Sequence, residues 1–111
     1  MKKVEAIIRP SALRGVLDGL KSVGYSGVTV YEVHGHGSQK GITESYRGQS
    51  VEGLLAKLVV TTVVNDKHLN KVISVITKTA RTGEIGDGKI FVSPVAGAVR
   101  IRTGEKGDKA I

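Results

Sequence analysis

The chain contains no cysteine or tryptophan, and it has only one phenylalanine, three tyrosines and two prolines among its 111 residues. Without cysteine, disulfides, thiolate metal sites and cysteine nucleophiles are excluded. So few aromatic side chains argue against a base-stacking surface for nucleic acid. Apolar runs such as Leu58–Val60 are far shorter than the roughly 20 residues of a membrane-spanning helix, and no signal peptide is expected. These absences favour one small, soluble, cytoplasmic domain.

Acidic residues are also scarce relative to basic ones. Ten Asp and Glu stand against seventeen Lys and Arg, which gives a formal net charge of +7. Such an excess indicates anionic partners, such as phosphates, nucleic acid or a charged membrane surface.

The apolar pattern predicts six regular elements in the order βαββαβ. The strands are expected at 4–8, 28–33, 57–64 and 89–92, and the helices at 13–20 and 69–80, with Ser11 and Asp66 as N-caps. Val99–Ile101 is expected to be a short extended piece before a polar tail without pattern. This order predicts a ferredoxin-like α+β sandwich, an antiparallel sheet with two helices on one face.

The connection from Gly35 to Gly53 is far longer than the two to five residues of an ordinary hairpin loop. Long loops on compact domains are functional or disordered, and this one lacks the Ser and Pro enrichment of a linker. We interpret it as functional, with a plain surface insertion as the alternative.

A second glycine-rich segment, Thr82–Lys89, has three glycines within six residues. Backbone N–H groups that converge in such a loop form an anion-binding nest, and Lys89 adds a cation at its rim. It is not a P-loop, because Ile90 follows Lys89 where Ser or Thr is required. The alternative is an ordinary glycine-rich turn between helix and strand.

Arg100 and Arg102 stand two residues apart in the expected extended piece, so both side chains should lie on one face. Two guanidinium groups on one face suit a polyphosphate, whereas the alternative is a charged, solvated strand edge.

Catalytic and metal-binding patterns are weak. His34 and His36 have no third ligand at a suitable spacing, so strand-end histidines are the better interpretation. Ser11, Ser50 and Ser93 lack a nucleophile elbow, and no carboxylate pair is placed for acid–base chemistry. The sequence therefore offers no positive argument for an enzyme.

Several runs along the chain resemble the PII signal-transduction proteins of nitrogen regulation, over essentially the whole length. They are Lys2–Pro10, Gly27–Val33, Gly37–Gly41, Thr43–Gly48, Ala80–Pro94 and Arg100–Glu105. The resemblance implies a homotrimer of single ferredoxin-like domains that binds ATP or ADP between subunits and 2-oxoglutarate beside Mg²⁺ and ATP. It implies a T-loop at about 35–55, a B-loop at about 82–89 and a C-loop at about 102–111.

The resemblance also implies a role for individual residues. Nucleotide binding is carried over to Thr29, Gly35, Gly37, Val63, Gly86, Asp87, Gly88, Lys89, Arg100 and Arg102. Binding of 2-oxoglutarate is carried over to Gln39, Gly41, Lys57 and Gly86, with Gln39 also on Mg²⁺. Thr43, Tyr46 and Arg47 would contact partner proteins. The partner would be an ammonium channel at the inner membrane face, a nitrogen-metabolism enzyme or a transcription regulator, without nucleic-acid binding or membrane insertion.

The chain departs from the family pattern in the long loop. One residue is missing between Gly48 and Lys57, and Gln49–Gly53 lacks the tyrosine that many relatives nucleotidylate, so this modification is not expected. Ser50 stays open as a phosphorylation site. His36, Ser38 and Thr61 also depart from the usual residues. An adenylate-only sensor without a 2-oxoglutarate response is therefore the alternative.

Two functions from other classes have weaker support in the sequence. The order βαββαβ is also that of an RNA-recognition module, but 57–64 contains no aromatic residue for base stacking. A slow ATPase would need a general base, and none is identifiable in the sequence.

Overall fold

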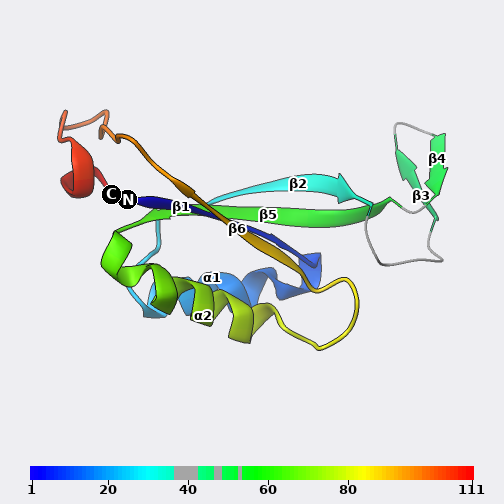
Figure 1. Ribbon diagram of the computed structural model, residues 1–111. Coiled ribbons are helices and arrows are strands. Elements are labelled where there is room, and N and C mark those ends of the chain that lie inside the picture. Colours follow the sequence, from blue (N-terminus) through cyan, green and yellow to red (C-terminus); the bar gives the residue numbers. More distant parts are fainter. Residues whose placement is uncertain (37–42, 47–48, 53) are drawn as a thin grey trace.

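The computed structural model describes residues 1–36, 43–46, 49–52 and 54–111, and it describes side chains only outside 37–53. Four strands form one antiparallel sheet in the order β2-β5-β1-β6, with bounds Thr29–Gly35, Leu55–Val64, Lys2–Ile8 and Gly88–Pro94. Helices α1 (Leu13–Ser22) and α2 (Leu69–Ala80) cover one face of this sheet and leave the other open (Figure 1). The predicted ferredoxin-like α+β fold is confirmed.

The core lies between the helices and the sheet because alternate strand residues point toward the helices. Val4, Ala6 and Ile8 of β1 are buried, and they meet Val16 and Leu20 of α1 and Val72 and Ile76 of α2. Burying each of the valine, leucine and isoleucine side chains contributes about 1.5–3 kcal/mol. The two helices approach closely at Gly19, where an added Cβ would lie 2.7 Å from Cγ1 of Val75.

The alternation also identifies the residues on the open face. Lys3, Glu5 and Ile7 point away from the helices, and the residues directly opposite them on β5 and β6 share that face. The open face therefore carries Val63, Thr61 and Val59 from β5 and Ser93, Phe91 and Lys89 from β6. Continuing the register from β5 to β2 adds Thr29, Tyr31 and Val33, with Lys57 opposite Val33.

Both predicted N-caps are wrong. Ser11 lies inside a 3₁₀ turn, Pro10–Ala12, that precedes α1, and no side chain caps either element. Before α2 the cap is Asn65, whose side chain accepts the Lys67 N–H at 3.2 Å at the start of the 3₁₀ turn Asp66–His68. Asp66 instead binds the amino group of Met1 at 2.9 Å, and this hydrogen bond lowers the pKa of its carboxyl.

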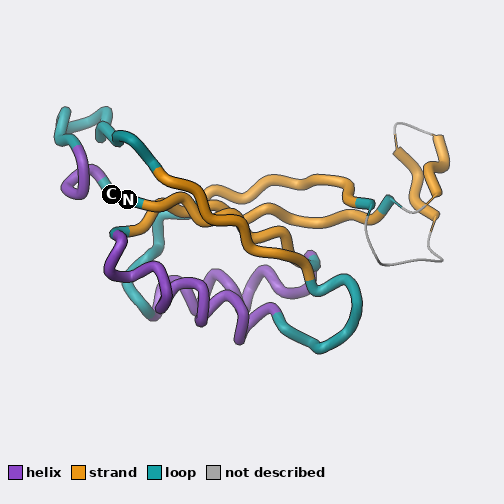
Figure 2. The backbone as a smooth tube through the Cα atoms, viewed as in Figure 1, coloured by secondary structure: helices purple, strands orange, loops and turns teal. Residues whose placement is uncertain are grey.

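The long connection contains two strands, β3 (Thr43–Tyr46) and β4 (Gln49–Glu52), which pair with each other as a separate two-stranded sheet. Figure 2 shows this small sheet beyond the ends of β2 and β5.

The extended piece predicted for Val99–Ile101 is also wrong. Val99 bridges to Lys106, residues 101–103 form a turn, and the tail ends in a 3₁₀ helix, Gly107–Ala110. Among the described residues, no helix is long and apolar enough to cross a membrane.

Candidate functional site

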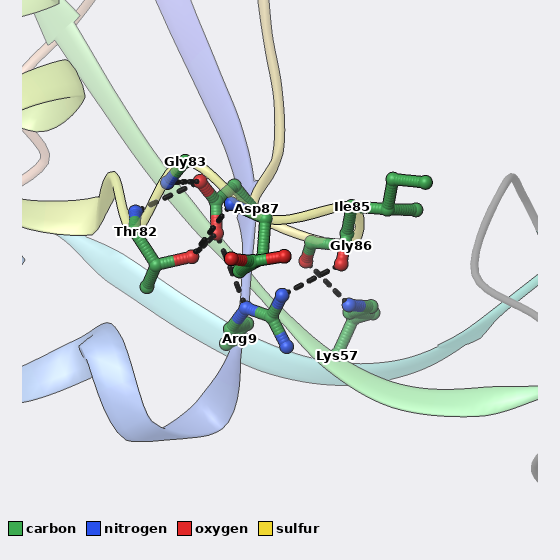
Figure 3. Close-up of polar contacts among 8 residues, drawn as sticks. Arg9, Lys57, Thr82, Gly83, Ile85, Gly86 and Asp87 are labelled. Carbon is green, nitrogen blue, oxygen red and sulfur yellow. Dashed lines mark hydrogen bonds and ion pairs between the residues drawn. The ribbon is translucent and has the colours of Figure 1, made fainter.

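The glycine-rich segment Thr82–Lys89, called here the glycine loop, is closed by one carboxylate. Asp87 accepts the backbone N–H groups of Thr82 and Gly83 through Oδ2, each at 2.8 Å, and the Thr82 hydroxyl through Oδ1. These bonds are local because the loop turns back on itself within five residues (Figure 3). Asp87 thus shapes the loop from inside, as an Asx-type residue does in a tight turn.

Arg9, directly after β1, ties this loop to the sheet. Its Nε donates to Oδ1 of Asp87 at 3.2 Å, and its Nη2 donates to the carbonyl oxygen of Ile85 at 2.7 Å. The hydrogen bonds from Thr82, then those from Gly83 and Arg9, hold the pKa of Asp87 well below its usual range. The carboxylate therefore stays ionised, and the loop keeps this shape at neutral pH.

Lys57 approaches the loop from the open face of the sheet. Its Nζ donates to the carbonyl oxygen of Gly86 at 2.7 Å. Burial lowers the pKa of Lys57, and the Arg9 charge lowers it further, while Asp87 opposes both. Gly35, the last residue of β2, lies beside Lys57, so that an added Cβ would stand 3.6 Å from Cγ.

Gly88 begins β6 in a conformation that other residues avoid, with φ +107°. A Cβ built on Gly88 would lie 1.7 Å from the carbonyl oxygen of Ile7. Only glycine lets the loop exit so close to β1, which sets Lys89 on the open face opposite Ile7.

A cavity of about 560 Å³ lies at the opposite end of the sheet. Thr29 and Val63 line it, and so do Lys3, Thr61 and the C-terminal Ile111. The segment before β2 that forms one wall is held in place, because the Tyr25 hydroxyl bonds Nδ1 of His68 and the Thr62 hydroxyl donates to the Gly27 carbonyl at 2.9 Å.

Arg100 and Arg102 belong to a short hairpin, residues Ala98–Gly107, called here the arginine hairpin. Backbone bonds from Arg100 N–H to Glu105 O (2.9 Å) and from Gly104 N–H to Arg100 O (2.7 Å) close it. Arg100 also pairs with Glu105, Nη1 to Oε1, at 3.1 Å. The shared strand face that the sequence suggested for Arg100 and Arg102 is not present, because Arg102 lies in the turn itself.

The expected site residues thus form two groups within one chain. Gly35, Lys57 and Gly86–Lys89 lie at the glycine-loop end of the sheet. Thr29, Val63 and the arginine hairpin lie at the other end, beside both termini (Figure 1). The structure does not bring the arginines to the glycine loop within one chain.

Several expected residues cannot be placed on this site. Gly37, Gln39, Gly41 and Arg47 lie outside the described residues. Thr43 and Tyr46 bound β3, of which only the backbone is described. In the described part of the chain, no three His, Asp or Glu side chains group as a metal site would require.

Arg9 and Thr82 are structural residues of the site that the sequence interpretation missed. Arg9 follows the first predicted strand directly, and it bonds Asp87, 78 residues away. The sequence shows only a charged residue after an apolar strand, and this pattern does not identify the residue that it bonds.

Comparisons with known proteins match the same family over nearly the whole chain. The family model described as nitrogen regulatory protein P-II matches residues 1–105. The chain is 57% identical to nitrogen regulatory protein P-II of Microchaete diplosiphon and 52% identical to that of Azospirillum brasilense, both chains being covered in full. It is 53% identical to nitrogen regulatory protein P-II 2 of Methanothermobacter thermautotrophicus, over all of this chain and 97% of the relative.

Proposed function

The chain belongs to the nitrogen regulatory protein P-II family, as its sequence resemblance predicted, and within that nitrogen-signalling role we propose that it is a non-enzymatic sensor of adenine nucleotides and 2-oxoglutarate. It binds ATP or ADP, reads 2-oxoglutarate beside MgATP, and controls partner proteins from the cytoplasm through its long loop.

The observation that carries this proposal is the built glycine loop. Hydrogen bonds made by Asp87 and Arg9 hold the loop in one shape, while Gly88 leaves Lys89 on the open face. A loop held in one shape beside a lysine suits a phosphate chain, because a cation that is already in position loses little freedom when an anion binds. The cavity lined by Thr29 and Val63 suits the adenine, which has a flat apolar face and a polar edge.

The two halves of such a site meet if one chain supplies the glycine loop and another supplies the arginine hairpin. A contact between two different surfaces is heterologous, and it closes into a ring when the rotation allows, as in a homotrimer. The open sheet face supports this assembly, since Tyr31 and Phe91 on it are 45% and 52% exposed. Exposed apolar area of this kind marks a contact surface.

The 2-oxoglutarate part of the proposal rests on Lys57. Its ammonium group lies at the glycine loop, 2.7 Å from the carbonyl oxygen of Gly86, where it could pair with a ligand carboxylate. Mg²⁺ would arrive with the nucleotide phosphates and would need oxygen ligands. The expected protein ligand, Gln39, lies outside the described residues, so no geometry is assigned to it.

The partner contact is assigned to the long loop. Its hairpin β3–β4 stands apart from the four-stranded sheet (Figure 2), as a segment that changes shape with ligand state would need to. An ammonium channel, a nitrogen-metabolism enzyme or a transcription regulator would each fit such a contact.

Calorimetric titration tests the ligand assignment directly. MgATP and ADP are each titrated with and without 2-oxoglutarate. The proposal expects stoichiometric nucleotide binding and 2-oxoglutarate binding only together with MgATP. Nucleotide binding without any 2-oxoglutarate response would support the adenylate-only alternative, and sustained phosphate release over many turnovers would support an ATPase.

A complementation experiment tests whether the site spans two chains. Lys89→Ala removes one cation from the glycine loop, and Arg100→Ala removes one from the arginine hairpin, so each variant alone should bind ADP weakly. If the two are unfolded together and refolded as mixed assemblies, some sites combine an intact loop with an intact hairpin, and tight binding should return at those sites. No recovery in verified mixed assemblies would place both residues in one chain's site.

A further inference from the structure

The tip of the arginine hairpin carries an apolar side chain in an unusual position. Ile101 is 99% exposed, between Arg100 and Arg102. Among the large apolar side chains that the structure describes, it is the most exposed. An isoleucine this exposed is poorly suited to a turn, because β-branched residues favour strands and apolar area in water is unfavourable.

The hairpin that presents Ile101 is rigid. The bridge between Val99 and Lys106 lies below the turn, and the N–H of Gly107 bonds the carbonyl oxygen of Ala98 at 3.0 Å. Glu105 stabilises the turn through its ion pair with Arg100 and through the hydrogen bond that its N–H donates to the Thr103 hydroxyl at 3.2 Å. A side chain on such a frame loses little conformational freedom on binding, which is what an interface anchor requires.

We propose that Ile101 is the apolar anchor that docks the arginine hairpin on a second copy of this chain, and that this contact sets the position of Arg100 and Arg102 in the shared site. The inference rests on the proposed function, because it places the hairpin at the glycine loop of a neighbouring copy. It adds a residue to which the proposed ligand chemistry gives no role, since an isoleucine binds neither phosphate nor carboxylate.

The second copy is the occupant that the observations favour. The arginines need the phosphates that a glycine loop would hold, and their own loop lies at the far end of the sheet (Figure 1). The glycine-loop end also offers apolar surface, since Ile85 in that loop is 64% exposed. Docking there would bury Ile101 and hold both flanking guanidinium groups beside the nucleotide.

The test uses a matched pair of substitutions in the full chain. Ile101→Thr keeps the β-branch and replaces apolar surface with a hydroxyl, whereas Ile101→Val keeps the apolar character. Sedimentation velocity over a range of concentrations gives the assembly, calorimetry gives the ADP affinity, and circular dichroism confirms that the fold is intact. Because the side chain is almost fully exposed, neither variant should change the secondary structure.

Ile101→Thr should raise the concentration at half-dissociation by about ten-fold or more and weaken ADP binding by a similar factor, as expected for loss of an interface anchor. Ile101→Val should stay within about three-fold of the parent on both measures. Parent-like assembly and affinity for Ile101→Thr, or equal losses in both variants, would overturn the proposal. So would a parent chain that is monomeric, or an Ile101→Thr variant that loses only binding to a different protein.

The outcomes also separate this inference from the proposed function. If the parent assembles but binds no adenylate, and Ile101→Thr still weakens assembly, the anchor stands and the nucleotide proposal fails. If the parent binds adenylate and Ile101→Thr changes neither measure, the nucleotide proposal stands and the anchor fails.

Discussion

The sharpest consequence of the glycine loop concerns Gly88, where the chain leaves the loop and enters β6. Replacing Gly88 with alanine puts a methyl group 1.7 Å from the Ile7 carbonyl oxygen, inside any possible contact distance. A side chain at φ +107° costs about 1–3 kcal/mol by itself. Moving the start of β6 away from β1 would also break one or two ladder hydrogen bonds, at about 1 kcal/mol each. The substitution should therefore destabilise the protein by about 2–5 kcal/mol.

Urea unfolding followed by circular dichroism, at one fixed chain concentration, measures this loss. Gly97→Ala is the matched control, because an added Cβ there meets nothing within 4 Å, and its stability should stay within about 0.5 kcal/mol of the parent. The ADP affinity of Gly88→Ala should also fall, since the displaced strand carries Lys89. A Gly88→Ala protein as stable as its Gly97→Ala counterpart would refute the close approach of β6 to Ile7.

Three further predictions concern the glycine loop and the β3–β4 hairpin of the long connection. Arg9→Met keeps an unbranched apolar stem but removes the guanidinium bonds to Asp87 and to the Ile85 carbonyl. ADP affinity measured by calorimetry should therefore fall although Arg9 itself need not touch the ligand. An unchanged affinity would contradict its positioning role. Asp87→Asn should lower the free energy of unfolding at pH 7. A carboxyl whose pKa is lowered by folding stabilises the fold above its unfolded pKa, and this contribution is lost as the pH falls toward the folded pKa. The difference in stability between the variant and the parent should therefore shrink below about pH 4. Urea titrations at pH 7 and pH 3 measure this, and a deficit independent of pH would contradict it. Deleting 43–50 should spare nucleotide binding and abolish capture of a partner such as an ammonium channel in a pull-down, and a retained partner would place recognition elsewhere.

Lys57 offers one more test, because its ammonium group lies at the glycine loop, 2.7 Å from the carbonyl oxygen of Gly86. Lys57→Met should abolish 2-oxoglutarate binding while ADP binding stays within a few-fold of the parent, as calorimetry can show. Equal loss of both ligands would mean that Lys57 acts by supporting the Gly86 carbonyl rather than by pairing with a carboxylate.

Much of the fold could be predicted from the sequence because the periodic pattern is strong. The buried residues of β1 alternate, and the apolar residues of α2 recur at helical spacing, so both elements were predicted within a few residues of their bounds. The caps were wrong for a local reason. Each α-helix is preceded by a 3₁₀ turn, which moves the start of the α-helix past the residue that looked like a cap.

The C-terminal segment shows where pattern reasoning fails. Val99 and Ile101 alternate like strand residues, but Gly104 takes a positive φ of 74°, which lets the chain turn back so that Lys106 pairs with Val99. Alternation over three residues is too short to distinguish a strand from one arm of a tight hairpin.

The sequence by itself determined the family, the order of the elements and the two segments that carry the candidate chemistry, because these depend on residue types and local spacing. Only the tertiary structure decided that Arg9 and Asp87 meet across 78 residues, that Lys57 reaches the glycine loop, and that the arginine hairpin lies at the opposite end of the sheet. Such contacts depend on strand order and register, which bring distant residues together or hold them apart. No local pattern contains that arrangement, and the separation of the two groups of candidate site residues follows from it.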